Sequence, residues 1–425
     1  IENGQIKCYN NTAAAIALYG DLYPGCVPLN PFGPTSITDA AYYYWSRTTK
    51  FALTNSMDDI AADISGDLFA LPAGPVRAAL SGEMRWLTYD VKSNASPTAL
   101  VDCTGLRLCG GPTQTLWDNN TLASATADEN VWEFSGEANI PILKDIPFVQ
   151  SFGVNLAGRY TDYSVSGAVQ TWKVGLDWHV NDDLRFRGTT SIDIRAPTLN
   201  DLYAPTSSTS IGYFDLLTNY AGTGTQQVTQ GNPALVPEVA RTYTVGMVLT
   251  PTWFEGFQAS VDFYNINLHN AIGSVAGNDP QVQALCNNSV GTSPLCALYT
   301  RPFAYTNTTP ANYPAAVFSR NLNSAFQATE GEDYEIDYRF SLNAIREAWA
   351  GIVSLRAMLN VAPKIDGMQF PGAQITHTTS PKGHAALFAD YTLGNWSVNG
   401  QVHWFSGLRK NGLLVTPQVF AVPRV

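Results

Sequence analysis

Ten charged side chains stand at alternating positions in segments that also alternate between apolar and polar residues. They are Lys173, Asp177, Arg185, Arg187, Asp193, Arg195, Glu335, Asp337, Arg339 and Arg356. Residues two apart on a β-strand share a face, so we expect all ten on one wet face of a sheet. Such a face could line a path for a polar or anionic ligand. Alternatively, the charges form cross-strand ion pairs that keep the face hydrated, and we favour this second interpretation.

No catalytic arrangement is recognisable among the other reactive residues. The histidines are widely spaced, and none has a metal-ligand spacing with Cys, Asp or Glu. Adjacent acidic residues such as Asp182 and Asp183 would point to opposite faces of a strand and cannot act together as a dyad. The sequence has no GxSxG motif, no Walker A loop and no GxGxxG motif after a strand. We therefore expect a protein that is not an enzyme and has no metal or cofactor.

Six cysteines fall into three local pairs, each within one stretch rich in Gly, Pro and Asn. The pairs are Cys8 with Cys26, Cys103 with Cys109, and Cys286 with Cys296. Even, local pairing predicts three disulfides and an oxidising compartment. Free buried thiols and a metal site are the alternatives, although no CxxC motif and no nearby histidine support a metal site.

Alternation with a period of two recurs along the chain and predicts β-strands with one dry and one wet face. Phe152, Val154 and Leu156, for example, alternate with Asn155 and polar neighbours. The predicted strands are 51–69, 75–92, 131–143, 150–163, 168–180, 183–196, 238–250, 255–273, 316–342, 350–363, 382–393 and 395–407. The fold class is therefore all-β.

The connections between these strands differ in length in a regular way. Short turns follow every odd-numbered strand, whereas most other connections are long, at 93–130, 198–237, 274–315 and 364–381. All three cysteine pairs fall on the side of the long connections. Transmembrane barrels have tight turns on one side of the membrane and long loops on the other. We therefore predict a transmembrane antiparallel β-barrel whose charged face lines a lumen.

Composition agrees with a barrel and limits the alternatives. The chain has 425 residues, 45% of them hydrophobic, and a mean hydropathy of −0.07. No run of 18 apolar residues exists that could form a membrane-spanning helix. The net charge of −11 argues against a nucleic-acid partner. The chain opens at Ile1 without Met or a signal-peptide pattern and stops at Val425 within an apolar-polar stretch, so we expect a fragment of a longer protein.

Four short motifs, spread in order over nearly the whole chain, resemble the barrel region of TonB-dependent outer-membrane receptors. The first two are Gly25–Asn30 with Phe32 and Gly33, and Asp63–Phe69 running into Leu71–Pro75. The third is Arg195–Leu199 with Leu202 and Tyr203. The fourth is Gly231–Pro233, Leu235, Pro237–Glu238, Thr242–Tyr243 and Gly246.

The resemblance implies a 22-stranded barrel in the bacterial outer membrane, closed by a plug domain. It also implies energised uptake of a scarce nutrient, such as a siderophore, vitamin or oligosaccharide, through an N-terminal segment that contacts TonB. Residues 1–425 then represent about twelve strands of the barrel, without the plug, that segment or the last strands. The expected partners are the lipid bilayer, the TonB system and an unidentified nutrient.

Two other classes of protein remain open from the sequence. A plugless porin or adhesin barrel would have the same strand pattern without the plug upstream. A secreted, soluble β-rich binding module or glycan hydrolase is the third alternative. The long loops have no readable chemistry, so the sequence does not identify the ligand or the residues that bind it.

Overall fold

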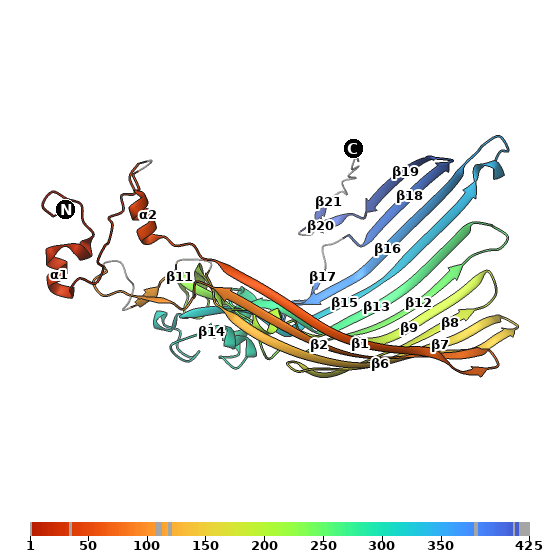
Figure 1. The fold of residues 1–425 in the computed structure, drawn as a ribbon, viewed down its shortest axis with the longest axis horizontal. Helices are drawn as coiled ribbons and strands as arrows, with labels where there is room; N and C mark the ends of the chain where they lie inside the picture. Colours follow the sequence, from red (N-terminus) through yellow and green to blue (C-terminus); the bar gives the residue numbers. More distant parts are fainter. Residues whose placement is uncertain are drawn as a thin grey trace.

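The computed structural model describes residues 2–33, 36–106, 113–117, 121–377, 381–410 and 413–415, and twelve long strands dominate it (Figure 1). They are β1 (Phe51–Leu71), β2 (Gly74–Ser93), β6 (Ala125–Ile146), β7 (Val149–Tyr163), β8 (Gly167–His179), β9 (Leu184–Arg195), β12 (Glu238–Leu249), β13 (Phe257–Ala276), β15 (Ala316–Ser341), β16 (Ile352–Met368), β18 (Gly383–Leu393) and β19 (Trp396–Phe405). Each overlaps one of the twelve predicted ranges, so the predicted strand set is confirmed.

These strands form one curved antiparallel meander in which each strand pairs with the next along the chain. Within the described residues, β1 pairs only with β2 among the long strands, and β19 pairs only with β18. The sheet is therefore an open wall with two free edges. Further strands that pair with these edges would be needed to close it.

The two faces of the wall differ as the alternation predicts. Apolar side chains cover one face and remain exposed along it; Leu176, for example, is 48% exposed, with Val154 and Gly188 as its cross-strand neighbours. A soluble sheet would bury such a face against another layer. A continuous exposed apolar face of this kind suits contact with lipid. No helix in the described part of the chain is long and apolar enough to cross a membrane.

The two ends of the sheet also differ (Figure 1). Tight connections at 72–73, 147–148, 180–183, 250–256, 342–351 and 394–395 lie at one end, called here the turn end. The helices and most of the shorter strands lie at the other end, called here the loop end. They are α1 (Ala13–Tyr19), α2 (Asp39–Trp45), β3 (Leu100–Asp102), β4 (Thr113–Thr115), β5 (Thr121–Leu122), α3 (Leu199–Tyr203), β10 (Ser207–Asp215), β11 (Tyr220–Thr229), α4 (Pro280–Asn288) and β14 (Tyr299–Thr300). Three further short strands follow β16 and β19, namely β17 (Thr376–His377), β20 (Leu408–Lys410) and β21 (Leu413–Val415).

The largest cluster of buried apolar side chains in the described residues lies at the loop end. Val275, Val282, Cys286, Val317 and Phe370 belong to it and are almost fully buried. These residues come from the loop-end extensions of β13 and β15 and from the long connections that follow β13 and β16. The buried core therefore belongs to folded loops, because the sheet itself exposes its apolar face.

Candidate functional site

The polar face of the sheet is the first part of the candidate site. The cross-strand register places all ten charged residues of the sequence analysis on this one face. In the backbone register, Asp177 on β8 lies opposite Arg187 on β9, and Arg187 lies opposite Gly246 on β12. Gly246 in turn lies opposite Asp262 on β13. Asp262 in turn faces Asp333, two residues from Glu335, and Asp337 faces Arg356. The remaining candidates lie an even number of residues away on the same strands.

Most of these charges form ion pairs between strands. Arg185 on β9 donates two hydrogen bonds to Asp177 on β8, at 2.8 and 2.5 Å. Arg356 on β16 pairs with Glu335 and lies 3.7 Å from Asp337. The pairs are largely exposed, so each adds little stability by itself. Their main consequence is that these charges already have partners and are not free to bind a ligand.

Another pair explains why the fourth motif contains a glycine. Arg187 on β9 donates two hydrogen bonds, at 2.8 and 2.5 Å, to Asp262 on β13, although β12 lies between these strands. The pair passes over Gly246, where a Cβ atom would clash with Asp262 Oδ1 and lie 3.2 Å from Arg187 Nε. A side chain at position 246 would therefore displace the pair.

Lys173 differs from the other cations that line the hollows of this face. Two open hollows, of about 670 and 620 Å³, lie over the polar face of β2, β6, β7, β8 and β9. Arg85 and Arg159 line the first and both contact Glu133, at 3.6 and 3.2 Å. Lys173 lines both hollows and is the one lysine or arginine lining them that has no ion-pair partner among the described residues. An anionic group that entered either hollow could pair with Lys173 without breaking an existing ion pair.

Arg195, the last residue of β9, joins the third motif to the fourth. Its guanidinium donates to both carboxylate oxygens of Glu238, the first residue of β12, at 2.7 and 2.8 Å, and lies 3.4 Å from Asp201. Asp201 completes a capping box with Thr198 at the start of α3. Gly231 packs so closely on α3 that a Cβ atom would lie 2.5 Å from Ala204 N. The two motifs thus form one tight cluster that fixes where the chain leaves and re-enters the sheet.

A folded module formed by two long connections is the second part of the candidate site. We call residues 207–229 and 277–315 the loop module. Parallel pairing of β11 with the start of β15, and antiparallel pairing of β14 with the same segment, join the module to the sheet. Cys286 in α4 and Cys296 form a disulfide with a Cα–Cα distance of 5.2 Å. The module therefore has strands, a helix and a covalent link of its own.

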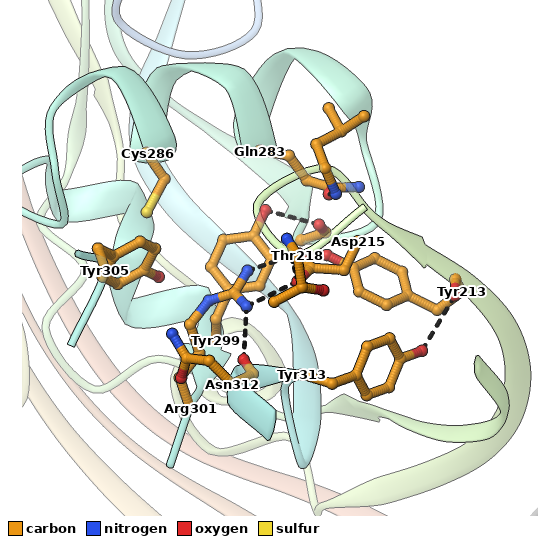
Figure 2. A network of polar contacts seen from close by, with 12 residues as sticks. Tyr213, Asp215, Thr218, Gln283, Cys286, Tyr299, Arg301, Tyr305, Asn312 and Tyr313 are labelled. Carbon is orange, nitrogen blue, oxygen red and sulfur yellow. Dashed lines mark hydrogen bonds and ion pairs between the residues drawn. The ribbon is translucent and has the colours of Figure 1, made fainter. Parts of the chain in front are cut away.

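A buried ion pair lies at the centre of this module (Figure 2). Arg301 donates to both oxygens of Asp215, at 2.6 and 2.9 Å, and to the carbonyl of Asn312 at 3.0 Å. The Arg301 side chain is 3% exposed and that of Asp215 is fully buried. The guanidinium also lies 5.4 Å from the ring of Tyr299 and 5.1 Å from that of Tyr305. One ion pair thus joins β10 to the second long connection.

Polar side chains around the pair satisfy the backbone of the surrounding loops. Asn312 donates from Nδ2 to the carbonyls of Ala304 and Asn307, and its Oδ1 accepts a hydrogen bond from the Phe303 amide. Tyr313 donates from its hydroxyl to the Tyr213 carbonyl at 3.0 Å (Figure 2). Buried loops need such partners because water is excluded from their amides and carbonyls. The network therefore holds the loops in one arrangement.

The environment of the pair shifts the pKa values of its members. Burial would raise the pKa of Asp215, but hydrogen bonds from Arg301 and Thr218 outweigh burial and hold that pKa below its usual value. Burial raises the pKa of the Tyr213 and Tyr299 hydroxyls. At neutral pH, Asp215 is therefore a carboxylate, Arg301 is a cation, and both tyrosines are neutral.

The cysteine predictions fall into two groups. The structure contains disulfides at two of the three expected pairs, Cys8–Cys26 and Cys286–Cys296. The Cys103–Cys109 prediction lies outside the described residues, because Cys109 is not among them. Tyr23, within the loop closed by the first disulfide, donates to the Asp102 carbonyl at 2.7 Å. The N-terminal segment therefore packs against the first long connection, at the loop end.

Sequence reasoning missed the buried pair and most of the loop module. Asp215 and Arg301 are 86 residues apart, and neither belongs to an alternating pattern. The available signals were the Cys286–Cys296 pair and the capped start of α4, where Asp279 precedes Pro280. Both indicate ordered loops, but neither identifies the partner of an isolated charge.

The family comparison accounts for the strand pattern, the motif cluster and the disposition of turns and loops. A family model described as "TonB dependent receptor-like, beta-barrel" matches residues 9–416. The chain therefore belongs to this family of outer-membrane β-barrels. It is an all-β protein of the bacterial outer membrane, and its family consists of receptors and transporters rather than enzymes. A comparison with curated protein sequences gave no match.

Solved structures with a similar fold include a siderophore receptor and a ferric enterobactin receptor. The siderophore receptor PirA from Acinetobacter baumannii has a TM-score of 0.54 and 15% sequence identity, over 84% of this chain and 43% of PirA. A variant of the ferric enterobactin receptor PfeA from Pseudomonas aeruginosa, solved with enterobactin, has a TM-score of 0.54 and 13% identity, over 86% of this chain and 44% of PfeA. At these identities the likeness concerns the fold. The chain spans less than half the length of either receptor.

Proposed function

We propose that residues 1–425 are a part of the barrel of a receptor that takes up a scarce nutrient across the outer membrane. In this proposal the ten charged residues face the lumen, and a plug domain outside residues 1–425 fills it. Uptake is energised by the TonB system through an N-terminal segment that also lies outside this range. Family membership supports the barrel, and the loop module supplies ordered surface at the loop end, where a ligand would arrive.

Within this function, an iron-chelate or similar anionic nutrient is the class we favour. The observation that carries this choice is Lys173, which lines both hollows and has no ion-pair partner among the described residues. Each hollow has a volume that suits a small-molecule ligand. The two similar receptors are described as a siderophore receptor, PirA, and a ferric enterobactin receptor, PfeA, and both descriptions agree with this class.

An uptake assay tests the receptor function directly. The full-length protein would be expressed in cells that lack their own receptors and supplied with labelled ferric siderophores, cobalamin and oligosaccharides. We expect saturable uptake of an anionic ferric siderophore that stops when a protonophore collapses the proton gradient. Uptake that continues after protonophore treatment would contradict the energised receptor and favour the plugless porin.

Substitution of Lys173 tests the ligand class. Lys173→Gln removes the unpaired charge, and we expect the concentration for half-maximal uptake to rise about tenfold, because a charge-assisted hydrogen bond contributes roughly 1.5–3 kcal/mol. The matched control is Arg187→Gln, which removes a charge already paired with Asp262. Equal half-maximal concentrations for Lys173→Gln and the parent would remove Lys173 from the ligand site.

A further inference from the structure

Two histidines face each other on the polar face of the last hairpin. In the register of β18 and β19, His384 is paired with Phe405, and Ala386 with His403, so the histidines are diagonal neighbours. His384 Nε2 and His403 Nδ1 lie 3.4 Å apart. The ring centroids are 5.7 Å apart and the ring planes differ by 14°. The two nitrogens therefore face one another across a gap of hydrogen-bond length, in which either nitrogen can donate.

The size of this gap suits a metal ion. Two imidazole nitrogens at 2.0–2.1 Å from one tetrahedral ion lie about 3.3–3.4 Å apart. The observed separation of 3.4 Å therefore requires only that the rings rotate until their lone pairs converge. No movement of the hairpin backbone is needed, since the register already brings the side chains together.

Neighbouring side chains contact both imidazole rings. The Gln401 carboxamide contacts Nε2 of His403, the nitrogen that faces away from His384. The Gln401 atom nearest that nitrogen is its amide Nε2, so binding of an ion through Nδ1 requires the carboxamide to turn by 180° and present its carbonyl oxygen. In that orientation Gln401 would hold the proton on Nε2 and leave the Nδ1 lone pair free. The His384 ring stacks on Phe405, with centroids 4.4 Å apart and planes differing by 5°. These contacts limit the orientations of both rings before any ion binds, and the rotation that brings the lone pairs together starts from them.

We propose that His384 and His403 form a binding site for a transition-metal ion of the borderline-to-soft class, with copper bound best. The described residues contain no group of three or more His, Cys, Asp or Glu that could hold an ion, so any further side-chain donor among them is of another type. Met358 on β16 is paired with Ala386 on the side away from His403, which places a thioether in the adjacent position. Imidazole and thioether donors favour copper over magnesium or calcium. This site is independent of the proposed uptake function.

A copper titration of the untagged full-length protein in detergent tests the site. We expect one tightly bound Cu²⁺ whose electron paramagnetic resonance spectrum shows coupling to two imidazole nitrogens. His384→Gln and His403→Gln should each lose that signature and weaken Cu²⁺ binding at least tenfold. His179→Gln is the matched control, because His179 lies on the same face and contacts Asp177 instead. Unchanged binding in both test variants, or an equal loss in the control, would overturn the proposal.

Two milder variants separate a specific site from a disturbed hairpin. Gln401→Ala keeps both imidazoles, and we expect about tenfold weaker Cu²⁺ binding, as for other residues that orient a metal ligand. Met358→Leu keeps the shape of the wall and should weaken Cu⁺ binding while leaving Zn²⁺ binding unchanged. Unchanged Cu⁺ binding in Met358→Leu would overturn the assignment to copper. The shift in gel mobility on boiling would confirm that each variant has folded.

Discussion

The same chemical pair, an aspartate with an arginine, occurs in two very different settings in this molecule. Asp177 and Arg185 pair on the polar face of the sheet, with side chains 46% and 39% exposed. Asp215 and Arg301 pair inside the loop module, with side chains 0% and 3% exposed. The hydrogen-bond lengths in the two pairs are similar, between 2.5 and 2.9 Å. The two pairs therefore differ in the burial of their side chains and not in their hydrogen-bond lengths.

This difference in burial indicates that the charges have different roles in the sheet and in the loop module. The sheet is held by its backbone ladders and by the contact of its apolar face with lipid, so its exposed pairs mainly keep the polar face hydrated. The loop module joins segments far apart in the chain. There the buried pair contributes specificity, because loss of one partner would leave the other charge buried alone.

Removal of the buried arginine should produce the largest effect. Arg301→Met keeps an unbranched side chain of similar length but leaves the Asp215 carboxylate without its partner. We expect the free energy required to open the loop module to fall by about 3–5 kcal/mol. Hydrogen exchange of residues 207–229 and 277–315 in the native protein measures that quantity.

The matched control is the exposed pair of the sheet. Arg185→Met should cost at most about 1 kcal/mol, since exposed pairs contribute little and His179 still lies 3.4 Å from Asp177. Similar losses for Arg301→Met and Arg185→Met would show that burial does not set the contribution of these pairs.

The two faces of a single strand provide the next comparison. Leu176 lies on the exposed apolar face of β8, and its neighbour Asp177 lies on the polar face. Leu176→Arg should cost about 2–4 kcal/mol if the side chain lies near the middle of the bilayer, whereas Asp177→Asn should cost little. Reversible unfolding of the full-length protein in lipid vesicles gives both values. Equal costs at the two positions would contradict the assignment of the apolar face to lipid.

The sequence predicted the sheet well because alternation is a local signal. Each strand face is set by residues two apart, so Phe152, Val154 and Leu156 identify a dry face without knowledge of any other strand. Turn chemistry then gave the order of the hairpins. The register between strands comes from the structure, and it places Lys173 and Asp177 on one face, as the alternation predicts.

Contacts between distant segments were not predictable in the same way. The loop module depends on Asp215 meeting Arg301 across 86 residues, and neither residue has a periodic neighbour that indicates its partner. The His384–His403 contact was easier to predict, because the two residues lie on the two strands of one hairpin, on either side of the turn at 394–395. Ligand spacing along the chain does not reveal it, because the pairing across the hairpin, rather than sequence distance, brings the two rings together.

Acid should open the loop module before it affects the sheet. The pKa of Asp215 is lowered in the folded protein, so its pair contributes full stability above the unfolded value of about 3.9. This contribution is lost as the pH falls through the lower folded pKa. The effect should be absent from neutral pH down to about 4 and should appear below it. Proteolysis within 207–229 and 277–315, by pepsin in acid and by thermolysin at pH 7, follows the opening when each rate is corrected for the activity of that protease on an unfolded substrate at the same pH.

A variant whose residue 215 cannot ionise distinguishes the opening caused by protonation of Asp215 from other effects of acid on the protein. Asp215→Asn leaves Arg301 buried without an anion, so its module should already be open at pH 7 and cleavage should not rise further below pH 4. Cleavage of the parent should rise only in acid and only at the loop end, since the ladders of the sheet do not titrate. If the variant and the parent shared the same pH profile, another acidic group would control opening. The comparison of the buried and exposed pairs would then not explain how the loops are held.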